Sequence, residues 1–137
     1  MGGVGGTLAG NPVSMAATRA TLEEVLTAAA FATMTEVAGT FADGVRKIIA
    51  GFALPWSVAQ LGARVEYRFA DPAPRTGTES AATADPALED FLHTYLINRG
   101  ILLTPFHNMA LMCPQTTTDD VARHHEVFAA ALGELLG

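Results

Sequence analysis

The sequence predicts an α+β fold, in which helices cover a small, mainly antiparallel sheet of about three to four strands. Three observations predict it. Apolar residues recur at alternating steps of three and four between residues 31 and 52, the spacing of one helix face. Apolar and charged residues alternate between residues 56 and 69, the pattern of a β-hairpin. Two further helix starts follow, at residues 85–86 and 116–120.

Two helices are expected in the first half of the chain. The first begins at Asn11-Pro12, because asparagine is a preferred N-cap and proline is favoured at the first helical position, and it runs to about Leu26. The second contains Gly39 and Gly44, each costing on the order of 1 kcal/mol relative to alanine, so packing must hold it. Its apolar stripe, expected to be core or interface, consists of Phe31, Met34, Ala38, Phe41, Val45, Ile48 and Phe52.

The hairpin is expected to turn at Leu61-Gly62. Residues 70–84 are rich in proline, alanine, threonine and serine, and they are expected to form a loop that is either disordered or lies over the domain as a cover. Alternation along the second strand divides its residues between two faces, with Val65, Tyr67 and Phe69 on one and Arg64, Glu66 and Arg68 on the other.

The rest of the chain predicts two helices and two short strands. Asp85-Pro86 starts a helix that Gly100 ends at the C′ position. Residues 101–104 and 109–113 are expected to be buried strands joined by a turn at 105–108. Residues 116–120 cap the last helix, with acidic residues complementing its N-terminal dipole. Its inner face is expected to carry Val121, Phe128, Leu132 and Leu135.

Composition narrows the classes of function. The net charge of −6 and the lack of any run of basic residues argue against nucleic acid and against an anionic membrane as partners. Every apolar run is interrupted well short of membrane length. The single cysteine, Cys113, excludes an internal disulfide and is typical of a reducing cytoplasm; its apolar surroundings predict a buried, inert thiol.

Residues 1–11 form a glycine-rich lead-in to the first helix. Glycine allows backbone N–H groups to face a ligand, and a helix N-terminus favours anions, so this stretch is a candidate anion cradle with the Thr7 hydroxyl as an extra donor. A flexible leader explains the same composition equally well. The stretch matches neither the P-loop, which needs a lysine here, nor the dinucleotide fingerprint, which needs a preceding strand.

The sequence of residues 5–17, GGTLAGNPVSMAA, resembles the segment that leads into the C-terminal small domain of class III (fold type I) pyridoxal-phosphate aminotransferases. The glutamate-1-semialdehyde aminomutase branch is the most similar. Residues 98–105 and 116–121 resemble later segments of that domain in the same order, so residues 12–137 are expected to be this small domain. The resemblance implies that Gly6 and Thr7 bind the phosphate of pyridoxal 5'-phosphate in the neighbouring subunit, and hence a homodimer.

The loop at residues 104–108 is the candidate substrate loop. Polar groups on a turn between apolar segments often serve recognition, although an exposed turn in which Asn108 supports the backbone explains them too. The resemblance implies that Thr104, Pro105, His107 and Asn108 face the substrate pocket. Many class III transaminases have an arginine where this chain has Thr104, and aminomutases have a glutamate shortly after the proline, where this chain has no acid. The substrate is expected to be an amino or keto compound, and these residues do not identify which one.

No residue of this chain is expected to be catalytic by itself. Lys47 is the only lysine and is expected to be solvated, whereas a Schiff-base lysine needs a desolvated pocket; in the family that lysine lies upstream of the glycine-rich motif. His124 and His125 are adjacent on a helix, about 100° apart, and cannot grip one metal together. His124 is expected to face solvent and His125 to be partly buried, and no metal site is expected.

Two functions are consistent with these observations. The first is the C-terminal domain of a pyridoxal-phosphate-dependent class III aminotransferase or aminomutase, which moves an amino group between an amino acid or amine and a carbonyl substrate and is inactive without the catalytic part. The alternative is a non-catalytic folded module that works in assembly or dimerisation through exposed apolar faces.

Overall fold

The computed structural model describes residues 10–104 and 107–137, and it has the α+β architecture that the sequence predicts. The strands form one antiparallel sheet in the order β1-β2-β3. The elements in chain order are α1 (Pro12–Ala20), a π-helical turn (Thr21–Val25), α2 (Ala28–Gly51), β1 (Ser57–Leu61), β2 (Arg64–Arg68), α3 (Gly77–Ala82), α4 (Pro86–Ile97), β3 (Met109–Leu111) and α5 (Thr118–Leu136).

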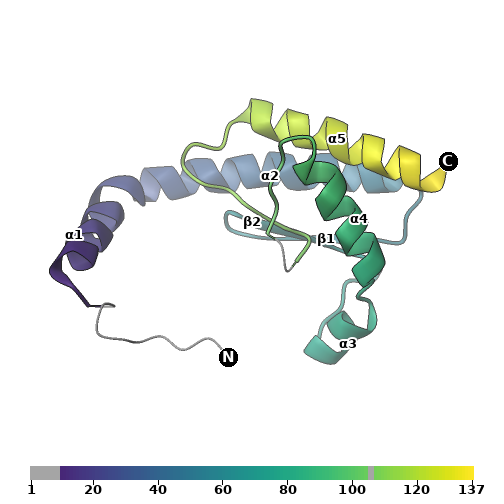
Figure 1. Cartoon of the computed structure of the whole chain (residues 1–137), viewed down its shortest axis with the longest axis horizontal. Coiled ribbons are helices and arrows are strands. Elements are labelled where there is room, and N and C mark those ends of the chain that lie inside the picture. The colour runs from purple at the N-terminus through teal and green to yellow at the C-terminus, as the bar shows by residue number, and fades with distance from the viewer. Residues whose placement is uncertain (1–9, 105–106) are drawn as a thin grey trace.

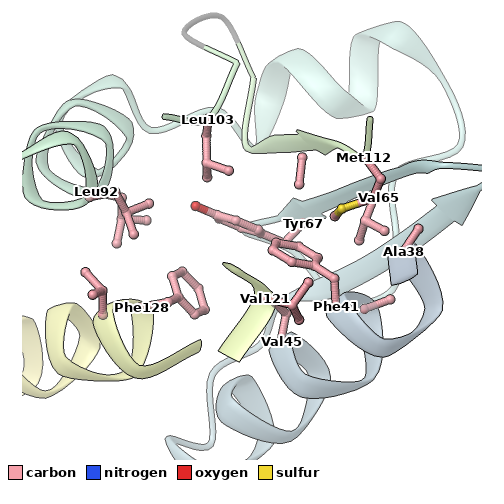
Figure 2. Packing of buried hydrophobic residues seen from close by; sticks show 14 of the residues in the cluster. Ala38, Phe41, Val45, Val65, Tyr67, Leu92, Leu103, Met112, Val121 and Phe128 are labelled. Carbon is pink, nitrogen blue, oxygen red and sulfur yellow. The ribbon is translucent and has the colours of Figure 1, made fainter. Parts of the chain in front are cut away.

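Helices α2 and α5 run side by side over one face of the sheet, and α4 packs against α5 (Figure 1). Tyr67 from the middle strand points into this layer, where its ring lies 5.1 Å from that of Phe128, centroid to centroid (Figure 2). Val65 and Tyr67 are almost completely buried on this face, as the alternation predicted. The opposite face carries Arg64, Glu66 and Arg68.

Helices α1, α4 and α5 begin where the sequence predicts a capping residue. The side chains of Asn11 and Asp85 accept hydrogen bonds from the backbone N–H groups three residues later, and proline follows each of them. Thr117 and Asp120 form a capping box at the start of α5. At the end of α4, Gly100 has a φ of +83°, and the N–H of Ile101 donates to the carbonyl of Leu96, so the predicted glycine C′ position is confirmed.

The structure corrects three predicted boundaries. Residues 70–84 are not all loop, because α3 forms inside them, held by a capping box between Thr76 and Glu79. Residues 101–104 are not a strand: within the described part of the chain, their one backbone hydrogen bond to β3 joins the Thr104 N–H to the Met109 carbonyl. The predicted strand over 109–113 is shorter, since pairing with β2 extends only from Met109 to Leu111.

Three side chains lie differently from their predicted positions. Cys113 is exposed, because it follows the end of β3 in the turn that leads to α5. Leu135 is 42% exposed, since it falls in the last turn of α5. Phe31, expected to be core or interface, is exposed in the first turn of α2 and is therefore not part of the core of this chain. His124, expected to face solvent, is only 3% exposed. The periodicity of a single sequence shows which face of a helix is apolar. It does not show how far along the helix other elements cover that face.

No single helix in the described ranges is long and apolar enough to cross a membrane. The helices Pro12–Val25 and Ala28–Gly51 are long and apolar enough only when they are taken together, and the chain bends by 71° between them.

Helices α2 and α5 are in close contact at Gly44. The His125 ring lies where a side chain at position 44 would project, and its Nε2 is 3.1 Å from the backbone carbonyl oxygen of Phe41, within hydrogen-bond distance. Glycine is therefore required at this position by the approach of the second helix and not by its own backbone angles.

The Gly44→Ala variant is expected to lower the free energy of unfolding by about 1–3 kcal/mol, because its Cβ overlaps the His125 ring. Gly39→Ala, on the same helix, is the matched control: only the end of the Gln60 side chain lies near its Cβ, so alanine is expected to stabilise by about 0.5–1 kcal/mol. Urea unfolding measures both. The double variant Gly44→Ala/His125→Ala is expected to recover part of the loss, and equal effects at positions 39 and 44 contradict the explanation.

His124 lies between the rings of Phe41 and Phe128, with centroid distances of 4.5 and 5.5 Å. Neither of its ring nitrogens finds a hydrogen-bond partner among the described residues. Burial, with a smaller contribution from the neighbouring His125, lowers the pKa of His124 to about 3. This histidine is therefore neutral in the folded protein at ordinary pH.

Stability is expected to fall on mild acidification because of His124. Its pKa is lower in the folded than in the unfolded state, so between about pH 6.5 and pH 3 the unfolded state binds more protons, and stability is lost as pH falls through that window. From pH 7 to pH 5 this one residue contributes a loss of about 2 kcal/mol. Urea unfolding at both pH values should show a smaller pH dependence in His124→Leu than in the wild type or in His93→Gln, a partly exposed control.

Candidate functional site

The candidate substrate loop connects the segment after α4 to β3. The N–H of His107 donates to the Thr104 carbonyl at 3.3 Å, and the Asn108 carbonyl accepts from the N–H of Tyr67 on β2 at 3.1 Å. Thr104, His107 and Asn108 are thereby held together at the edge of the sheet. Pro105, the fourth predicted loop residue, and Gly6 and Thr7, the predicted phosphate-contacting residues, lie outside the described residues.

The side chains of this loop differ in exposure. Asn108 is buried, and its side-chain oxygen has no hydrogen-bond partner within the described residues. His107 is about half exposed, and its Nδ1 lies 3.6 Å from Oε1 of Glu66. The loop therefore places one imidazole at the surface beside a carboxylate from a neighbouring strand.

Glu66 is the residue of this site that the sequence did not reveal. Alternation placed it correctly on the outer face of β2, but the structure buries it: Arg64 lies 2.7 Å from Oε2, and Arg68 lies 2.8 Å from Oε1. The signal was the Arg-x-Glu-x-Arg spacing, since residues two apart on a strand share one face. The loop at residues 104–108 lies beside the outer face of β2 because Glu66 pairs with Met109, and only the structure gives this pairing.

A pocket of about 460 Å³ opens beside the loop, between residues 100–104, β3 and the start of α5. Its walls are mostly apolar, with Leu103, Met112 and Val121 among them, and Thr104 lies at its edge. His124 also lines this pocket, although both of its ring nitrogens are buried. The pocket has the size of a small-molecule site, and its polar lining includes Thr116, Asp120 and Arg123, of which Asp120 is engaged in the capping box of α5.

The described residues contain few groups able to do covalent chemistry. Lys47 is exposed on α2, as predicted. The Thr116 hydroxyl lies 3.4 Å from the Cys113 sulfur, and this hydrogen bond is the main cause that lowers the pKa of the exposed thiol. Across residues 10–104 and 107–137, no group of three histidine, cysteine or acidic side chains is arranged to hold a metal ion. The arrangement can bind and orient a polar molecule.

The comparisons with known proteins agree on one family. The chain is 33% identical over 115 residues to the glutamate-1-semialdehyde 2,1-aminomutase of Desulfosudis oleivorans. Its fold matches crystal structures of a glutamate-1-semialdehyde-aminomutase from Pseudomonas aeruginosa PAO1, one of them in complex with PMP, with a TM-score of 0.91 and 50% identity over 97% of this chain. An omega-transaminase from Sphaerobacter thermophilus shares the fold, with a TM-score of 0.81 at 24% identity. No family model matches the chain.

The matches cover most of this chain but a small part of its relatives. The alignment spans 84% of the chain and 27% of the Desulfosudis protein, and the Pseudomonas structures are matched over 29% of their length. The order of the elements and the small antiparallel sheet are those expected of the family's C-terminal small domain. The chain is therefore similar to one part of class III aminotransferases, glutamate-1-semialdehyde aminomutases among them, and resembles the C-terminal small domain of these proteins.

Proposed function

We propose that the chain acts as the small domain of a pyridoxal-phosphate-dependent class III enzyme that moves an amino group between an amino acid or amine and a carbonyl substrate. The observation that carries this proposal is the 50% identity and the TM-score of 0.91 to an aminomutase whose crystal structure contains PMP. In such an enzyme the cofactor supplies an electron sink for the transfer of the amino group.

The described residues do not provide a site for that cofactor. A covalent site needs a lysine in a desolvated pocket, and Lys47, the one lysine of the sequence, is exposed to water. We therefore assign no step of the reaction to a lysine of this chain. The Schiff-base lysine is proposed to come from outside it, and this chain by itself is proposed to be inactive.

Two segments of the chain are proposed to contribute to the complete active site. Gly6 and Thr7 bind the cofactor phosphate of the neighbouring subunit in a cytoplasmic homodimer. In support, α1 begins five residues after Thr7 with a capped N-terminus, and no atom of the described residues beyond the chain neighbours lies within 4 Å of the place that a Cβ at position 10 would take. Thr104, Pro105, His107 and Asn108 face the substrate, where they orient it and limit access of water.

A second candidate function is an assembly module without activity of its own, and one observation favours it. Leu61 and Leu111 are both mostly exposed, and both pair with Arg64 in the sheet, so they share its outer face; Leu102 is also mostly exposed. Apolar side chains gathered in this way are typical of a surface that another protein surface covers. The catalytic proposal explains the same exposure, because the remainder of a larger enzyme also covers it.

A chimera tests the proposed function. Replacing the matching part of the Pseudomonas aeruginosa aminomutase with this chain is expected to give a dimer that retains cofactor. Thr7→Ala in the chimera is expected to weaken cofactor retention by about tenfold, through loss of a charge-assisted hydrogen bond to phosphate. Absorbance after desalting measures retention. Thr18→Ala is the control, because that hydroxyl donates to the Ser14 carbonyl within α1. Equal retention in both variants contradicts the role of Thr7.

The chain alone is expected to form no specific adduct with pyridoxal phosphate. After equimolar addition and borohydride reduction, intact mass spectrometry should find Lys47 labelled no more than an exposed lysine of an unrelated protein, since it lies in water and not in a desolvated pocket. A stoichiometric adduct that survives desalting and disappears in Lys47→Arg overturns the proposal that the Schiff-base lysine lies outside this chain.

A further inference from the structure

Six arginines of the described residues form ion pairs, and in one place two of them share a single carboxylate. Four arginines each pair with a carboxylate of their own: Arg19 with Glu23, Arg46 with Asp43, Arg99 with Glu134 and Arg123 with Glu126. Arg64 and Arg68 instead share the single carboxylate of Glu66. Two positive charges against one negative charge leave a local excess of one on the outer sheet face, in a chain whose net charge is −6.

The geometry leaves both guanidinium groups able to bind more. Glu66 is held inside, with 11% of its side chain exposed, while the side chains of Arg64 and Arg68 are 45% and 29% exposed. Each guanidinium has five N–H donors. Among the described residues, Arg64 donates one hydrogen bond to Oε2 of Glu66, and Arg68 lies 2.8 Å from Oε1 as an ion pair without hydrogen-bond geometry. The remaining donors form the planar pattern that binds carboxylates with two parallel hydrogen bonds.

The cluster is part of the substrate loop and not a remote surface feature. His107 of the loop lies 3.6 Å from the same carboxylate, and Asn108 is bonded to the next residue of β2. The positive charge next to the loop is therefore supplied by β2.

We propose that Arg64 and Arg68 bind the carboxylate of an organic acid at this loop, with Glu66 fixing the two guanidinium groups and His107 flanking the site. The claim that the substrate of the enzyme carries a carboxylate rests on the proposed function. The binding itself does not, because it requires neither the cofactor nor the rest of an enzyme. Glu66 competes with the incoming carboxylate for the same donors, so its removal should strengthen binding, the opposite of what a purely structural ion pair gives.

Nuclear magnetic resonance titration of the full chain with sodium butyrate tests the proposal, with butyramide as the uncharged isostere and sodium chloride as the ionic-strength control. Saturable shifts of the Arg64 and Arg68 side-chain N–H signals are expected with butyrate alone. Arg64→Gln and Arg68→Gln should each weaken binding by about tenfold or more, and Glu66→Gln should strengthen it severalfold. Arg46→Gln, which removes an arginine paired with its own carboxylate, should leave binding unchanged.

Circular dichroism checks that each variant folds, and Arg64→Lys, which keeps the charge and loses the planar donors, serves as a second variant at that position. Equal binding of butyramide, shifts that follow ionic strength without saturating, or unchanged binding in both arginine variants overturns the proposal. So does a Glu66→Gln variant that binds butyrate no better than the wild type. Shifts that follow protein concentration without butyrate show instead that a second copy of the chain occupies the site. Butyrate binding without cofactor retention in the chimera would leave the carboxylate site standing and refute the proposed enzyme.

Discussion

The close approach of α2 and α5 is the constraint on which the rest of the domain depends. A residue with no side chain at position 44 lets the His125 ring lie against the backbone of α2, and a Cβ there would overlap the ring at this separation of the two longest helices. Tyr67, Phe128 and Phe41 fill the space that remains between those helices and the sheet (Figure 2). Because protein interiors are close-packed, a change in that distance reaches the sheet and therefore the loop at its edge.

Most of the fold could be predicted from the sequence, because its signals are local. The N-caps at Asn11 and Asp85, the period of α2 and the alternation of β2 each involve residues a few positions apart. The predictions failed where the answer depends on distant parts of the chain. His124 is buried because α2 supplies the aromatic ring of Phe41, and residues 101–104 stay outside the sheet although they are as apolar as a strand.

The candidate site shows the same division. The loop residues Thr104, His107 and Asn108 could be chosen as candidates from the resemblance of their segment to a known family. The structure brings them together at one edge of the sheet. Glu66 could not be assigned to that loop, because its proximity to His107 comes from pairing between strands that are separated by α3 and α4. Its burial also could not be read from a charged, alternating strand, where the usual expectation is a solvated side chain.

One strand, β2, supplies both the centre of the core and the charged face of the site. Tyr67 lies inside and Glu66 outside, one residue apart, and the backbone of Tyr67 also holds the loop through Asn108. If β2 slipped by one residue against its neighbours, Glu66 would enter the apolar layer, Tyr67 would leave it, and the loop would lose its anchor in the same event. The stability of the core and the assembly of the site therefore require the same strand register. A chain with the wrong register would not form a stable core, so a stably folded molecule is one in which the site is correctly assembled.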